Sequence, residues 1–134
     1  MKRFSFSLLL ALVPLLGTAC LMGSSLKRVP SSEAPRLPEG NGFYCYTAGR
    51  GEERGASCAR TEPECASRYQ DASDNGALDL QPCMPRPEAV CTAVFTDPEH
   101  VTWHCFGDEP SCTRYWPGTS FDSNMKQSEC VEAS

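Results

Sequence analysis

Eight of the nine cysteines in this chain of 134 residues follow one spacing twice. The steps between successive cysteines are 13, 7 and 18 residues in the first set and 14, 7 and 18 in the second. The dipeptide Glu62-Pro63 recurs as Glu109-Pro110, at the offset of 47 residues that also relates the last three cysteines of each set. A spacing repeated in such detail predicts two tandem copies of one unit of about 40 residues. The eight cysteines are Cys45, Cys58, Cys65, Cys83, Cys91, Cys105, Cys112 and Cys130.

The second copy predicts a β-hairpin over residues 89–106. A turn at residues 96–100, built on Asp97-Pro98, joins two strands that alternate apolar and polar residues. Counting outward from this turn places three apolar residues of one strand opposite three of the other, all on one face of the sheet. The predicted pairs are Phe95 with Val101, Ala93 with Trp103, and Cys91 with Cys105.

A short helix is expected after each hairpin. Thr61 and Asp108 are good N-cap residues, and Pro63 and Pro110 fall in the first turn, where proline is tolerated. The spacing along the second helix puts Trp116 on its buried stripe, as the counterpart of Tyr69 in the first copy.

A last short strand is expected to end each unit. The predicted fold class is therefore α+β, small and disulfide-rich, with two tandem β-β-α-β units over residues 43–84 and 89–134. A unit of this size cannot bury enough apolar surface to fold on its core alone, so the cysteines are expected to form disulfides.

Four cysteines allow three pairings in each unit. Because the helix begins where the second strand ends, we favour a bridge that clamps the two together, and a second bridge from the last strand to the first. The other two pairings of each unit stay open. The favoured pairs are Cys58–Cys65, Cys45–Cys83, Cys105–Cys112 and Cys91–Cys130.

The cysteine spacing resembles that of small exported cysteine-rich bacterial proteins of unknown function, some of which are tandem lipoproteins. The resemblance covers residues 43–134. It implies a similar disulfide module, and it carries no catalytic residues over to this chain.

Residues 1–19 have the features of a secretory signal peptide. Lys2 and Arg3 precede an apolar stretch, and small residues precede the ninth cysteine, Cys20. The sequence LLGTAC resembles the lipobox of bacterial lipoproteins, although Gly17 stands where that motif usually has leucine. We expect Cys20 to be lipidated, since a leftover thiol is unfavourable in an oxidising compartment. Ordinary cleavage after Ala19 is the alternative.

Residues 20–42 are rich in proline, serine and glycine and are expected to form a flexible tether. Leu21 follows the lipobox-like cysteine, which by the same resemblance implies the outer membrane; secretion is the alternative. Without Lys2 and Arg3, 10 basic residues remain against 17 acidic ones, a formal net charge of −7. An acidic chain is a poor partner for nucleic acid.

Metal and catalytic sites are not favoured by the sequence. Residues 71–79 match part of a calcium loop, but Pro82 stands where its last ligand belongs, so a polar glycine turn is preferred. His100 and His104 lack the short cysteine spacing of structural zinc sites. We therefore expect no cofactor, no metal and no enzyme activity.

Aromatic side chains are the best candidates for a binding site. They can stack on a sugar or anchor a protein, so a protein or a glycan is the expected ligand. The leading interpretation is a non-enzymatic, lipid-anchored interaction or structural module of the cell envelope. The alternative is a secreted inhibitor or toxin-like effector that presents a rigid loop, at residues 49–55 or 96–100. The candidate aromatics are Tyr44, Tyr46, Phe106, Tyr115 and Phe121.

Overall fold

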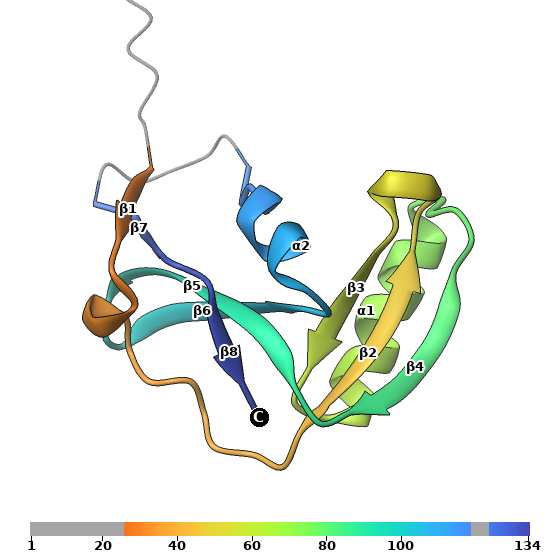
Figure 1. Ribbon diagram of the computed structural model, residues 1–134, viewed down its shortest axis with the longest axis horizontal. Coiled ribbons are helices and arrows are strands. Elements are labelled where there is room, and N and C mark those ends of the chain that lie inside the picture. The colour runs from red at the N-terminus through yellow and green to blue at the C-terminus, as the bar shows by residue number, and fades with distance from the viewer. Residues whose placement is uncertain (1–25, 119–123) are drawn as a thin grey trace, which may run out of the picture.

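The computed structural model describes residues 26–118 and 124–134, which form one eight-stranded sheet and two α-helices (Figure 1). Four disulfides cross-link these elements. The fold is therefore the small, disulfide-rich α+β type that the sequence predicts. Cys20 and the expected signal peptide lie outside the described residues, as does Phe121.

The first repeat is a hairpin, a helix and a third strand. The third strand returns antiparallel beside the first strand of the hairpin. The helix begins where predicted, because the Thr61 hydroxyl accepts a hydrogen bond from the Glu64 amide at 3.4 Å and Pro63 lies in the first turn. Its elements are β2 (Phe43–Ala48), η2 (Gly51–Glu53), β3 (Gly55–Ala59), α1 (Glu62–Asp74) and β4 (Gln81–Arg86).

The second repeat has the same order, with its third strand split in two. Both short strands pair with the first strand of the hairpin. The hairpin register is the predicted one, from Phe95 opposite Val101 to Cys91 opposite Cys105. Asp108 caps the helix by accepting a hydrogen bond from the Ser111 amide at 2.7 Å. The elements are β5 (Ala89–Asp97), β6 (His100–Phe106), α2 (Glu109–Arg114), β7 (Lys126–Ser128) and β8 (Val131–Ala133).

The two repeats share one sheet. Strands β3 and β6 pair antiparallel, with Ser57 opposite Phe106 and Cys58 opposite Cys105. Figure 1 shows β2, β3, β4 and α1 on one side of the molecule and the second repeat on the other, joined along this seam. The strand order is β1-β7-β5-β6-β3-β2-β4, with β8 also against β5.

The expected flexible tether is wrong for the described part of residues 20–42. Lys27–Val29 forms strand β1, which pairs parallel with β7, and η1 (Ser31–Glu33) follows it. Val29 is buried beside Ala93 and Phe95, and Leu37 packs against the core. A strand of three residues with one buried side chain gives too little periodicity to stand out in a proline-rich sequence.

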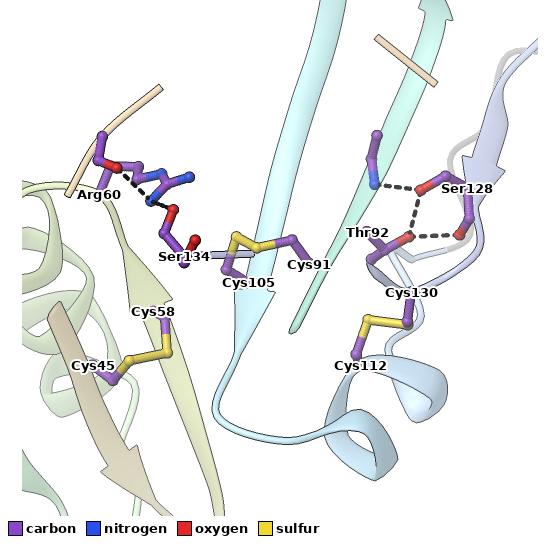
Figure 2. Close-up of a disulfide and its surroundings, with 12 residues drawn as sticks. Cys45, Cys58, Arg60, Cys91, Thr92, Cys105, Cys112, Ser128, Cys130 and Ser134 are labelled. Atoms are coloured by element: carbon purple, nitrogen blue, oxygen red, sulfur yellow. Dashed lines mark hydrogen bonds between the residues drawn. A yellow bond between two sulfur atoms is a disulfide. The ribbon is translucent and has the colours of Figure 1, made fainter. Parts of the chain in front are cut away.

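The favoured disulfide pairing is also wrong. All eight cysteines are bonded, but each repeat uses a bridge across its hairpin and a bridge from the helix to the chain that follows it. Figure 2 shows both hairpin bridges and the second helix bridge. The bridges are Cys45–Cys58, Cys65–Cys83, Cys91–Cys105 and Cys112–Cys130.

The two faces of the sheet explain this pairing. Tyr46 contacts Tyr69 of α1, so the helix covers the face on which Tyr46 lies. Cys45 is the neighbouring residue and points to the other face, where Cys58 lies directly opposite it. Cys65 approaches from the helix side and cannot reach Cys58 through the sheet. Each bridge closes a loop of 13 to 18 residues, which stabilises the fold by about 3 kcal/mol in the chain-entropy account.

Trp116 does not occupy the predicted buried stripe. Helix α2 ends at Arg114, and Trp116 lies beyond it with 56% of its surface exposed. Tyr115 packs on the sheet instead, against Phe106 and His104. The helix ends two residues before Trp116, so the i, i+4 spacing from Cys112 to Trp116 is not a helical one.

Candidate binding cleft between the repeats

Three side chains from three adjacent strands form a row on the helix-bearing face of the sheet. Tyr46 lies opposite Ser57, and Ser57 lies opposite Phe106 across the seam. Residues opposite each other in a ladder point to the same face. The row therefore belongs to both repeats and lies on the side of the sheet that carries α1 and α2.

The wall of the cleft comes from the residues at the end of α2. The ring of Tyr115 lies 5.3 Å from that of Phe106 and stacks on His104 at 4.5 Å, measured between centroids. The Tyr115 hydroxyl is 3.1 Å from Nε2 of His104. These contacts fix the Tyr115 ring beside the seam.

A cavity of about 300 Å³ lies between the row and this wall. Gly55 allows α2 to approach β3 closely, because a Cβ at this position would lie 3.1 Å from the Ser111 hydroxyl oxygen. Aromatic rings form much of the lining, and polar side chains complete it. The lining residues are Tyr46, Ala48, Glu53, Gly55, Ala56, Ser57, Phe106, Ser111, Arg114 and Tyr115.

The charged groups of this lining are available to a ligand, whereas the Ser111 hydroxyl is enclosed by protein. The Ser111 hydroxyl oxygen is buried and has no hydrogen-bond partner among the described residues. The ion pairs found in residues 26–118 and 124–134 involve neither Glu53 nor Arg114. The cleft thus offers the Ser57 hydroxyl, the Glu53 carboxylate and the Arg114 guanidinium around an aromatic surface.

His104 supports the cleft as a neutral ring. Burial, with a smaller contribution from the positive charge of Arg68, lowers its pKa to about 4. Burial also raises the pKa of Tyr115, against a smaller opposite effect of Arg68. At neutral pH both partners of the stacked pair are therefore uncharged, and the hydrogen bond between them holds without a buried charge.

The opposite face of the sheet is braced directly behind the cleft. Cys45, Cys58, Cys105 and Cys91 occupy successive register positions on the four adjacent strands β2, β3, β6 and β5. All four are buried and belong to one core cluster with Phe43 and Ala89. Two covalent bridges across the strands that carry Tyr46 and Phe106 limit the movement of the floor.

The structure brings three of the five predicted aromatics together. Tyr46, Phe106 and Tyr115 all line the cleft, and each is half-buried. Tyr44 lines a different cavity of about 540 Å³, together with Gly42 and Pro85. Glu53, Ser57, Ser111 and Arg114 were missed, because a sequence carries no signal for side chains that meet only through strand pairing and helix docking.

The partial calcium loop is not a loop. Asp71 and Ser73 lie within α1, and the Asp79 carboxylate binds Arg50 at 2.7 Å. The two histidines have separate partners: His100 bonds to Asp97 and His104 to Tyr115. Within residues 26–118 and 124–134, three or more acidic, histidine or cysteine side chains do not gather as metal ligands would.

In comparisons with known proteins, no family model, curated protein or solved structure matches the chain. Among the described residues, helices α1 and α2 are too short and too polar to span a bilayer. The four disulfides indicate that the folded part is made for an oxidising environment.

Proposed function

We propose that this chain is a non-enzymatic, exported interaction module that binds its partner in the cleft between the two repeats. The observation that carries this proposal is the meeting of Tyr46, Phe106 and Tyr115, from both repeats, around one cavity. Tyrosine and phenylalanine provide large contact areas at low cost in conformational entropy. A floor braced by two disulfides adds little further ordering cost when a ligand binds.

The chemistry of the described side chains supports binding rather than catalysis. The eight cysteines of residues 43–134 are all in disulfides, so none of them supplies a thiolate. His104 has its Nε2 next to the Tyr115 hydroxyl and its pKa at about 4, which makes it a poor general base at neutral pH.

The proposal includes a lipid anchor at Cys20 and a place in the outer membrane of the cell envelope. Its support is the lipobox-like LLGTAC sequence and the pairing of every other cysteine, which leaves Cys20 without a partner among them. Fractionation of cells fed a labelled fatty acid tests the anchor. Wild-type protein should carry label and sediment with membranes, and Cys20→Ala should do neither. A Cys20→Ala protein that still sediments with membranes contradicts the anchor.

Cleft-dependent capture tests the binding function. Purified, oxidised protein on beads is incubated with envelope material from the exporting cells, and the retained carbohydrate and protein are quantified. Tyr46→Ala should retain less than wild type. Tyr44→Ala is the matched control, because it removes the same side chain from the same face of β2, two residues away. Equal retention by all three proteins contradicts the proposed function.

The rigid-loop alternative has its own support in the turn at residues 96–100. The Asp97 carboxylate accepts hydrogen bonds from the amides of Glu99 and His100, at 2.9 and 3.0 Å. Such an exposed, ordered turn could be inserted into the site of another protein. Asp97→Ala would then abolish capture, whereas Tyr46→Ala would leave it unchanged.

A further inference from the structure

The cleft has the amphipathic lining of a saccharide site. Its floor and wall are aromatic, from Tyr46, Phe106 and Tyr115. Its accessible polar groups are side chains: the Ser57 hydroxyl and the charged groups of Glu53 and Arg114. A sugar ring has the complementary arrangement, because its two faces carry C–H groups and its edge carries hydroxyls. C–H groups with partial positive charge are attracted to the negative face of an aromatic ring.

We propose that the cleft binds one ring of a neutral saccharide, stacked on its aromatic lining, with the ring hydroxyls bonded to Glu53 and Arg114. This inference rests on the proposed function and names the ligand class of the same site. A cavity of about 300 Å³ is at the lower end of the range for small-molecule pockets, which fits a single ring better than a long ligand.

The charges of the cleft favour a neutral sugar over a charged one. Glu53 and Arg114 line the same cavity with opposite charges and have no ion-pair partner in the described part of the chain. An acidic sugar would meet the Glu53 carboxylate, and a basic one would meet the Arg114 guanidinium. Neutral hydroxyls can donate to the carboxylate and accept from the guanidinium, and hydrogen bonds to charged groups are the stronger ones.

A peptide that binds as an added β-strand fits this cleft less well. Such a peptide pairs its main chain with the free edge of a sheet, where unpaired backbone groups form a row. The cleft instead lies on the face of the sheet, and its floor residues are already paired in ladders, Tyr46 with Ser57 and Ser57 with Phe106. A bound peptide would therefore leave most of its own backbone groups without protein partners.

The duplication does not repeat the cleft. The cysteine alignment gives Thr92 as the counterpart of Tyr46, Ala59 as that of Phe106, and Arg68 as that of Tyr115. Thr92 is fully buried and bonds to Ser128, so it is not available to a ligand. We therefore expect one saccharide for each chain, although the chain contains two repeats.

The test is a titration of the purified, four-disulfide protein with the neutral sugars cellotriose, maltotriose and triacetylchitotriose, followed by NMR of the aromatic ring signals. At least one of these sugars should bind with 1:1 stoichiometry and shift the ring signals of Tyr46, Phe106 and Tyr115. Tyr46→Ala should weaken binding about 3- to 10-fold, as expected for the loss of one aromatic contact. Tyr44→Ala should leave the affinity unchanged.

Tyr46 also contacts Tyr69 of α1, so Tyr46→Ala can reduce binding by disturbing the fold. A second pair of variants therefore tests the cleft without changing this contact. Glu53→Ala removes an exposed carboxylate that lines the cleft, and Glu52→Ala removes its exposed neighbour, which does not line it. Glu53→Ala should weaken binding about 10-fold, and Glu52→Ala should not.

The outcomes separate this inference from the proposed function. The saccharide is ruled out if none of the three sugars shifts the ring signals, or if short neutral peptides shift them instead. If capture from envelope material still depends on Tyr46 in that case, the proposed function stands without a sugar ligand. If capture does not depend on Tyr46 either, both proposals fail.

Discussion

Cys58 and Cys105 lie directly opposite each other across the antiparallel seam between β3 and β6. They are the same position of the two repeats, because 47 residues separate them. An antiparallel pairing of equivalent residues defines a local two-fold axis at this point, as in an isologous dimer interface. The duplicated units thus associate within one chain in the way that two identical subunits would.

The first prediction concerns the sulfur atoms around this axis. Cys45, Cys58, Cys105 and Cys91 are neighbours across four strands, yet bridges form only within each hairpin. Digestion without reduction, with trypsin and a protease specific for acidic residues at mildly acidic pH, should release peptides joined as Cys45–Cys58 and Cys91–Cys105 in mass spectrometry. A peptide joined by Cys58–Cys105 would contradict the structure.

The hairpin register could be predicted from the sequence, but the disulfide pairing could not. Alternation of apolar and polar residues places Cys91 opposite Cys105, and that placement is observed. The favoured pairing relied on proximity along the chain between the hairpin and the helix. Proximity along the chain does not take into account the face of the sheet on which each sulfur lies. That face is set by the alternation of side chains along β2 and β3.

The seam and the cleft had no signal of their own in the sequence. The seam consists of only two residue pairs, between strands that occupy the same place in the two repeats. An edge this short does not specify from the sequence which other strand will pair with it. Composition identified Tyr46, Phe106 and Tyr115 as candidates. Only the seam places Tyr46 of one repeat beside Phe106 of the other.

The second prediction concerns close packing at the seam. The Gly107 amide donates to the Ala56 carbonyl at 3.0 Å, and a Cβ on Gly107 would lie 2.7 Å from the Ala56 Cβ. Gly107→Ala should therefore lower the free energy of unfolding by about 1–3 kcal/mol, measured by urea denaturation. Gly55→Ala is the comparison, because its new Cβ meets only the side chain of Ser111. Unchanged stability in Gly107→Ala would show that the seam is not tightly packed.

The third prediction concerns a buried serine that extends the pairing of β5 and β7. The Ser128 hydroxyl accepts a hydrogen bond from the Ala93 amide at 2.9 Å, and the Thr92 hydroxyl donates to the Ser128 carbonyl at 2.8 Å (Figure 2). Ser128→Ala leaves the buried Ala93 amide without this acceptor, which should cost about 1–3 kcal/mol. Amide exchange of Ala93 should become faster by hydrogen-exchange NMR.

Ser67→Ala on the exposed surface of α1 is the control for this substitution and should change neither stability nor exchange. Unchanged exchange of Ala93 in Ser128→Ala would mean that water replaces the hydroxyl at this position.

The fourth prediction concerns stability in mild acid. His104 is neutral in the fold because burial, with a smaller contribution from Arg68, lowers its pKa from 6.5 to about 4. Between these two values the unfolded chain binds a proton that the folded chain does not. Stability therefore falls as the pH decreases from 6.5 towards 4. His104→Gln removes this contribution, so its unfolding free energy should fall less than that of wild type between pH 6.5 and 4.5. Thermal and urea denaturation across this range measure the difference, and parallel curves for the two proteins would mean that His104 is not held neutral by the fold.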